Sequence, residues 1–361
     1  MSPFFAAIFL HALCLANAVN DIDFTTVYDW DKFDFAWPSG ANSSNNGQIF
    51  NPNYVHPRYM AVFGERLFIS LDLKNEVPAT LVWLPKSGTS TAPKLNPFPS
   101  WNFHIKYRKE CDTIKVANGI TADPDGRLWV LDEGFYGCPS KLWVFDLNNN
   151  DTTDRVHQFP DTVVSHSTSK RSLRDVVIDK TTDDYLAYIT DSESENIIVY
   201  SRKNDKSWAV KTPGKKWDSL DLSPNNREAR QLYLTERSYD YQLYSVSVSE
   251  LKNEGGSAAP KLIGKWREYP YRLVIDKANI LYAAFNYKKY LSKWNISEPF
   301  REQRVHEAGR LDCSWPFTFA LDVDDTLWIT ERNESGGVLR HKLFKAAVGA
   351  RPYLLTALPT P

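Results

Sequence analysis

The sequence has little net charge and few cysteines. It also has only one long hydrophobic run. Among its 361 residues there are four Cys, and Lys and Arg nearly balance Asp and Glu, giving a formal charge of −1. A chain without excess positive charge offers no reason to expect nucleic acid or an anionic membrane as a partner. The hydrophobic fraction of 42% and the aromatic fraction of 14% still suffice for a sizeable core.

Motifs of the common enzyme classes are also missing. The chain contains no Gly-x-Ser-x-Gly elbow, no His-Glu-x-x-His pair, no P-loop and no dinucleotide-binding glycine pattern. Residues His104, His157 and His166 show no metal-ligand spacing, so we interpret them as solvated or core histidines. No catalytic residue is therefore predicted.

The one long apolar run is residues 1–18, MSPFFAAIFLHALCLANA, which ends in a small-x-small pattern. It is too short and too close to the start for a typical membrane-spanning helix. We interpret it as a secretory signal peptide; the alternative is a buried N-terminal helix. Residues 19–361 are then predicted to form a single secreted domain. The sequence leaves its oligomeric state open.

Secretion determines how the cysteines are interpreted. Cys14 leaves with the signal peptide, and an oxidising compartment favours a disulfide over thiol catalysis or zinc binding. We predict the pairing Cys111–Cys138, which would stabilise the protein by roughly 3 kcal/mol, and a buried free thiol at Cys313. The Asn-x-Ser/Thr sequons predict N-glycosylation, which fits the secretory route; their asparagines are Asn42, Asn150, Asn295 and Asn333.

One phrase recurs along the chain: an apolar strand, an Asp- or Gly-containing turn, then a strand that carries an aromatic residue. The aromatic residues are Phe68, Trp129, Tyr188, Tyr233, Tyr282 and Trp328, at intervals of 61, 59, 45, 49 and 46 residues. About four short strands per unit at this period are typical of a β-propeller. We therefore predict an all-β fold with six four-stranded antiparallel blades around a central channel. We expect residues 33–37 to pair with the last blade. The alternative, a two-layer sandwich, does not explain the recurrence.

The second copy of the phrase carries a more specific pattern. Cys111 precedes residues 127–134, RLWVLDEG, and residues 138–142, CPSKL, lead into a strand that ends in Phe145-Asp146. This pattern resembles the yellow / major royal jelly protein family, and matching phrases run from about residue 35 to about residue 332. The resemblance implies a six-bladed propeller. It also implies roles in pigmentation, nutrition or signalling, dopachrome conversion, or the binding of biogenic amines such as serotonin and dopamine. The sequence departs from the family phrases at residues 330–333 and 293–295.

A polar residue also recurs where the second strand of each repeat ends. These residues are Asp72, Asp132, Asp191, Glu236, Asn286 and Glu331. Since equivalent positions in a ring of blades lie at one height, we expect several carboxylates to converge at one level of the channel or one rim. Converging carboxylates attract an organic amine or a hard cation such as calcium. The alternative is that each residue is a solvated cap or half of an ion pair.

These observations predict a secreted binding protein for a small cationic or aromatic ligand. The predicted ligand-binding residues are Asp132, Glu133, Asp191, Glu236, Phe285, Asn286 and Glu331. No metal site is predicted, although calcium is an open possibility. The alternative function is a pigment-pathway enzyme or a calcium-dependent, lactonase-like hydrolase. We interpret the acidic stretches at residues 123–126 and 322–325 as turns rather than calcium loops.

Overall fold

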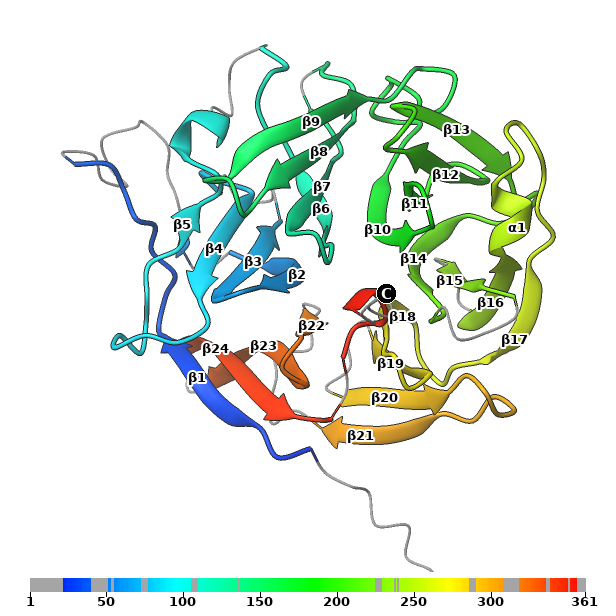
Figure 1. Cartoon of the computed structure of the whole chain (residues 1–361). Coiled ribbons are helices and arrows are strands. Elements are labelled where there is room, and N and C mark those ends of the chain that lie inside the picture. The colour runs from blue at the N-terminus through cyan, green and yellow to red at the C-terminus, as the bar shows by residue number, and fades with distance from the viewer. Residues whose placement is uncertain are drawn as a thin grey trace, which may run out of the picture.

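The computed structural model is a ring of six antiparallel four-stranded sheets, the predicted six-bladed propeller (Figure 1). It describes residues 22–39, 51–52, 55–72, 77–104, 110–135, 137–224, 229–236, 238, 240–285, 290–307, 318–335, 338–349 and 351–355. The predicted signal peptide, Asn42, Asn286 and Cys313 lie outside these residues.

The four strands of each blade run in order from the channel outward. Blade 1 contains β2 (Pro57–Phe63), β3 (Arg66–Leu71), β4 (Leu81–Pro85) and β5 (Asn96–Pro97); blade 2 contains β6 (Ala117–Ala122), β7 (Arg127–Asp132), β8 (Lys141–Asp146) and β9 (Thr152–Gln158); blade 3 contains β10 (Leu173–Lys180), β11 (Tyr185–Asp191), β12 (Asn196–Ser201) and β13 (Lys206–Lys211).

The second half of the ring repeats this order. Blade 4 contains β14 (Trp217–Leu222), β15 (Gln231–Glu236), β16 (Gln242–Ser247) and β17 (Lys261–Lys265); blade 5 contains β18 (Pro270–Ile275), β19 (Ile280–Phe285), β20 (Tyr290–Asn295) and β21 (Gln303–Glu307); blade 6 contains β22 (Phe319–Leu321), β23 (Thr326–Ser335), β24 (Val338–Ala347) and β1 (Thr25–Trp30). Among the described residues, three short helices lie outside the sheets: η2 (Trp101–His104), α1 (Val248–Leu251) and η3 (Tyr353–Leu355).

The N-terminal strand closes the ring, but it is not the strand that the sequence suggested. β1 pairs with β24, so a strand from the beginning of the chain completes the last blade and covers its edge. In the predicted stretch 33–37, Phe35 forms only an isolated parallel bridge with Leu95. Its aromatic side chain is fully buried against Trp37 and Trp101. The alternation of residues 33–37 therefore reflects packing against blade 1 rather than a sheet strand.

The core lies between the blades. Among the described residues the buried hydrophobic side chains form six clusters, and each cluster joins two neighbouring blades. All six aromatic residues used to count the repeats lie on second strands and are buried in these clusters. Apolar burial stabilises by about 25 cal/mol per Å², and a blade alone would leave both of its faces in water. The sheets are thus stable only as a ring.

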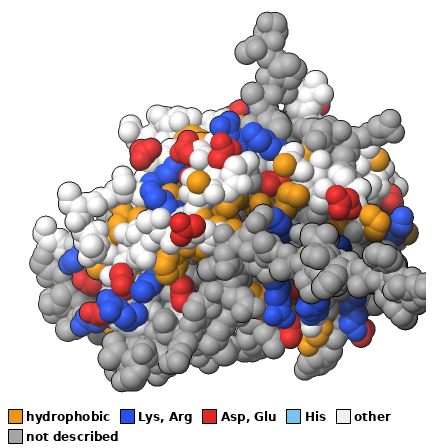
Figure 2. Space-filling model, turned by 90° about the horizontal axis from the view of Figure 1, so that it is seen from below, with side chains coloured by type: hydrophobic (Ala, Val, Ile, Leu, Met, Phe, Trp, Pro, Cys, Tyr) orange, Lys and Arg blue, Asp and Glu red, His pale blue; other side chains and the backbone are white. Residues whose placement is uncertain are grey.

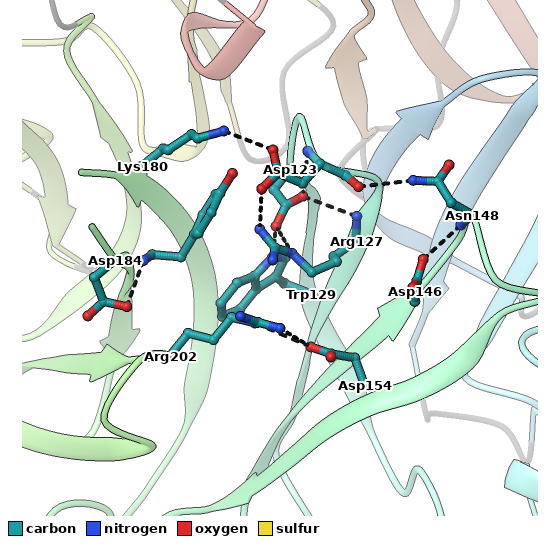
Figure 3. A network of polar contacts seen from close by, with 11 residues as sticks. Asp123, Arg127, Trp129, Asp146, Asn148, Asp154, Lys180, Asp184 and Arg202 are labelled. Atoms are coloured by element: carbon teal, nitrogen blue, oxygen red, sulfur yellow. Dashed lines mark hydrogen bonds and ion pairs between the residues drawn. The ribbon is translucent and has the colours of Figure 1, made fainter. Parts of the chain in front are cut away.

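In blades 2 and 6 the turn after the inner strand explains why an aromatic residue follows it. In blade 2, Asp123 accepts hydrogen bonds from the amides of Asp125 (3.0 Å) and Arg127 (3.1 Å) and from the indole of Trp129 (2.8 Å; Figure 3). In blade 6, Asp322 accepts the same three kinds of bond, with the indole of Trp328 at 2.8 Å. Because these oxygens already satisfy the turn and the aromatic side chain, the two acidic stretches are turns, as interpreted from the sequence.

Charged side chains link neighbouring blades on the outside of the ring. Lys180 of blade 3 pairs with Asp125 of blade 2 at 2.8 Å, and Arg202 pairs with Asp154 at 2.7 Å (Figure 3). On the side of the ring seen in Figure 2, acidic and basic side chains alternate around hydrophobic ones, and neither sign forms a large patch. Within the described residues there is no helix with the length and apolar character needed to cross a membrane.

Candidate functional site

The strand-end carboxylates lie at one end of the ring, but on the second strands rather than on the channel axis. Asp132 is 1% exposed and accepts hydrogen bonds from the amides of Val116 (2.9 Å) and Gly134 (3.0 Å) and from the indole of Trp143 (3.3 Å). Its carboxylate fixes the backbone that enters the inner strand β6. These hydrogen bonds are typical of a side chain that caps the backbone at the start of a strand. The predicted role of Asp132 in ligand binding remains a prediction.

Two other strand-end acids have similar local partners. Asp191 accepts from the amides of Ser172 (2.7 Å) and Glu193 (3.0 Å), which again fixes the approach to an inner strand. Glu236 pairs with Lys215 at 2.9 Å. Both acids are buried, and the partners named here belong to the same repeat as the acid.

The remaining predicted ligand residues are scattered. Phe285 is fully buried and packs against Trp266, with ring centroids 5.5 Å apart, in the core between blades 4 and 5. Glu331 lines a small pocket between blades 6 and 1, beside Trp30 and His341. The structure therefore does not gather the predicted set into one site. Among the described members, only Glu133 is part of a polar cluster at the channel end.

The inner strands bring a different set of polar residues together at the channel end where these strands begin. We call it the mouth cluster; its members are Arg58, Asn118, Glu133, Arg174, Asp218 and Tyr269. The Arg58 guanidinium donates to the Asn118 side-chain oxygen (2.9 Å), and the Asn118 amide donates to Glu133 Oε2 (2.8 Å). Residues from blades 1 and 2, far apart in the sequence, are joined by this chain.

The other half of the cluster comes from blades 3 and 4 and the segment that leads into blade 5. Arg174 Nε lies 3.4 Å from Asp218 Oδ1 and donates to the Ser192 hydroxyl at 3.2 Å. The Tyr269 hydroxyl donates to Asp218 Oδ2. Arg58, Glu133, Arg174, Asp218 and Tyr269 are all half-buried, so their side chains reach solvent at this end of the channel.

A buried ion pair lies beneath the mouth cluster. Arg272 donates to Asp175, Ser219 donates to the second Asp175 oxygen at 2.9 Å, and the Arg272 guanidinium lies over the Tyr59 ring at 4.8 Å. Burial raises the pKa of Asp175, and the Arg272 charge opposes that rise. The pair joins blades 3, 4 and 5 across the channel.

Electrostatics distinguish Glu133 from the strand-end caps. Burial raises the pKa of Glu133, while the charges of Arg174, Arg58 and Arg171 and the hydrogen bond from Asn118 oppose that rise. Deeper in the channel, burial raises the pKa of Asp221 to about 8, against hydrogen bonds from the amides of Leu222 and Ile275.

The channel below the cluster is narrow and closed at its far end. Its cavity holds about 90 Å³ and is lined by Asp221, Arg272 and apolar side chains of the inner strands. An engineered cavity of about 150 Å³ accommodates benzene, so this one is too small for an aromatic ring.

We call residues 351–355 the tail segment; Figure 1 shows its backbone in the middle of the ring. Its residues Pro352, Tyr353 and Leu354 line this cavity. Tyr353 is 5% exposed, donates to the Ile178 carbonyl at 2.8 Å and lies under the Arg230 guanidinium. Arg351 pairs with Asp325 at 2.8 Å, and its carbonyl accepts from the Lys277 amide at 2.9 Å.

The disulfide Cys111–Cys138 is present, as predicted, and it braces the connection that carries Glu133. In the described parts of the chain, no three His, Cys, Asp or Glu side chains lie close enough together to hold a metal ion. Of the sequons, Asn150 is exposed in the turn between β8 and β9, and Asn295 is half-buried at the end of β20. The backbone of Asn333 lies in β23, and its side chain lies outside the described residues.

The sequence did not single out most of the mouth cluster. Arg58, Asn118, Arg174 and Asp218 each occupy the second position of an inner strand, where β2, β6, β10 and β14 begin. A polar residue at the start of an otherwise apolar strand was the available signal. It was weak because the residue type changes from blade to blade.

Comparisons with known proteins agree with this architecture. A family model described as major royal jelly protein matches residues 116–220. The protein named Protein yellow of Drosophila yakuba is 32% identical over 196 residues, 50% of this chain and 35% of that protein, and its Drosophila melanogaster counterpart gives the same values. The match thus spans about a third of the relatives' own length.

Solved structures support the fold alone. A gluconolactonase from Xanthomonas campestris superposes with a TM-score of 0.55 at 11% identity, covering 91% of this chain and 92% of that protein. A luciferin-regenerating enzyme superposes with a TM-score of 0.53 at 11% identity, covering 83% and 94%. At such identities the shared propeller carries no information about substrate.

Proposed function

Because this chain belongs to the yellow / major royal jelly protein family, we propose that it is a secreted propeller that binds a small aromatic amine at the mouth cluster. One observation carries the proposal: the half-buried acids Glu133 and Asp218 both lie close enough to Arg174 to act on its charge at one channel end, while the tail segment occupies the other end. Secretion is supported by the apolar run at residues 1–18 and by the disulfide.

The chemistry of the mouth suits an ammonium group. Burial disfavours the ionised form of Glu133, and a bound cation beside it would stabilise that form. Tyr59 and Tyr271 lie near the starts of β2 and β18, next in sequence to Arg58 and Arg272. Tyr59 is buried with the Arg272 guanidinium over its ring, whereas Tyr271 is half-buried. Tyrosine rings attract a cation by about 0.5 to 2 kcal/mol, depending on desolvation. The aromatic part of the ligand would stay at the mouth, because the cavity below is too small for it.

The alternative, a pigment-pathway enzyme or a calcium-dependent hydrolase, is less well supported. One neighbour in fold is a gluconolactonase, but among the described residues no three His, Cys, Asp or Glu side chains lie close enough together to hold a metal ion. The organic amine can place its apolar ring against tyrosine, whereas a metal ion would need several more oxygen ligands.

Titration calorimetry with tyramine, dopamine and serotonin tests the proposal. We expect at least one amine to bind, and Glu133→Gln to weaken that binding about tenfold or more, since a hydrogen bond to a charged group contributes about 1.5 to 3 kcal/mol. Glu193→Gln is the matched control, because Glu193 is an exposed acid in the corresponding connection of blade 3. No heat with any amine at millimolar concentration would refute the proposal, and so would equal affinity in the Glu133→Gln variant and the wild type.

A further inference from the structure

We infer that the ligand of the mouth cluster carries a carboxylate beside its amine, so that the site selects an aromatic α-amino acid over the corresponding decarboxylated amine. The inference rests on the proposed function and specifies the ligand class of the same site. It follows from the donors and acceptors that remain available in the cluster.

Two guanidinium groups offer donors at the mouth. Arg174 uses only its Nε in the hydrogen bond to Ser192 and in the ion pair with Asp218; within the described residues its two terminal nitrogens have no hydrogen-bond partner. Arg58 uses Nη1 for Asn118, and its Nε lies 3.9 Å from an oxygen of Asp72. Their side chains are 21% and 27% exposed, respectively, so a ligand can reach them. A guanidinium fork matches the two oxygens of a carboxylate.

A third arginine provides the contrast. Arg171 is 1% exposed and donates to the carbonyls of Ser165, His166 and Cys138. These bonds commit it to holding the connection that carries Glu133. Arg58 and Arg174 therefore differ from a structural arginine in this same region.

Acceptors for an amine lie beside these donors. Glu133 accepts from Asn118 at Oε2, and in the described part of the chain no donor contacts its Oε1. Asp218 Oδ1 faces Arg174 in the ion pair, is buried, and receives no hydrogen bond from the described residues, so Glu133 Oε1 is the acceptor within reach of a ligand. The mouth therefore has unused hydrogen-bond donors and an unused acceptor, which come from blades that are neighbours around the channel.

The balance of charge favours a zwitterion over an amine. An ammonium group at Glu133 would lie near Arg58 and Arg174, whose charges act on that carboxylate, and like charges at a binding site oppose the ligand. A carboxylate on the same ligand would pair with those arginines and turn the repulsion into attraction. Selection then comes from an attractive contact for the amino acid and a repulsive one for the amine.

L-tyrosine and tyramine test this selection, because they share the ring and the amine and differ only in the carboxylate. In titration calorimetry of the purified full chain we expect L-tyrosine to bind at least about tenfold more tightly than tyramine. We expect Arg174→Gln to reduce this ratio to about threefold or less. Arg202→Gln, which removes a similarly exposed arginine on the outside of the ring, should leave the ratio unchanged. Arg58→Gln gives a second reading if Arg174→Gln does not fold, as judged by thermal unfolding.

The possible outcomes separate the inference from the function on which it rests. Tyramine that binds as tightly as L-tyrosine, or more tightly, overturns the inference and leaves the proposed amine-binding function intact. A tenfold preference that persists in both arginine variants also overturns it, because the carboxylate would then be recognised elsewhere. No heat with either compound overturns the inference, and the proposed function fails with it only if dopamine and serotonin also give no heat.

Discussion

The two ends of the channel are built from the same inner strands and yet differ in kind. At the end where these strands finish, Tyr353 of the tail segment is buried and its hydroxyl bonds to a main-chain carbonyl. At the end where they begin, the ionisable side chains of Glu133 and Arg174 are half-buried. The closed end depends on apolar packing and backbone bonds, whereas the mouth has side chains with unused hydrogen-bonding capacity. The comparison indicates that blades with the same strand arrangement can present available polar side chains at one end of the channel and a packed, closed surface at the other.

Among the changes considered, removal of the disulfide should have the largest effect, lowering both the stability of the protein and the affinity of the mouth for its ligand. Cysteines 111 and 138 are 27 residues apart in sequence, and a disulfide that closes a loop of this length stabilises by about 3 to 4 kcal/mol. We expect the double variant Cys111→Ser, Cys138→Ser to lower the free energy of unfolding by that amount and to weaken ligand binding, because the connection that carries Glu133 loses its brace. Urea unfolding and calorimetry measure the two effects. An unchanged midpoint would contradict the structural role of the bond.

Tyr353→Ala should affect the closed end alone. Deleting a large buried aromatic side chain costs about 3 kcal/mol or more, so the free energy of unfolding should fall while ligand affinity stays within about twofold of the wild type. Tyr353→Phe is the matched control, which keeps the ring and loses the hydroxyl that bonds to the Ile178 carbonyl, at a cost of about 1 kcal/mol. A marked loss of ligand affinity in Tyr353→Ala would show that the two ends are coupled.

Mild acid should lower the free energy of unfolding through His104, which lies in the connection between blades 1 and 2. Burial lowers the pKa of His104 to about 4, and its Nε2 donates to the Phe98 carbonyl at 2.8 Å. The folded protein keeps this histidine neutral, whereas the unfolded chain binds a proton near pH 6.5. Its contribution to stability is therefore complete above pH 6.5 and is lost as the pH falls toward 4.

At 1.36 kcal/mol per pH unit, acidification from pH 6.5 to 5 should remove about 2 kcal/mol through this group. His104→Gln keeps an N–H donor and does not titrate, so its stability should depend less steeply on pH. Urea unfolding at pH 5 and pH 7 provides the measurement. Parallel pH profiles for the variant and the wild type would exclude His104 as the cause.

The sequence predicted the blades because each repeat encodes its own turn and its own buried aromatic residue. Asp123 and Trp129 lie six residues apart and bond to each other, so the pattern that was counted is also the contact that stabilises the turn. The ring-closing strand was misplaced because Phe35 alternates with polar residues as a strand would, although its partners are the side chains of Trp37 and Trp101.

The mouth cluster was less accessible to prediction. Asp132 and Asp191 do recur at equivalent strand ends, and their carboxylates accept hydrogen bonds from backbone amides next to their own inner strands, so a structural role alone can account for their recurrence. The contact between Arg58 and Asn118 joins residues 60 positions apart. Only closure of the ring brings such residues together, and their types share no pattern that a single sequence could reveal.

The most direct test of the central claim is a crystal structure of the protein with L-tyrosine bound. We expect density for the ligand at the mouth cluster, with its ammonium within hydrogen-bonding distance of Glu133 or Asp218 and its carboxylate on Arg174 or Arg58. Density at the tail segment, in the pocket beside His341, or only on the outer surface of the blades would contradict the assignment of the mouth as the binding site.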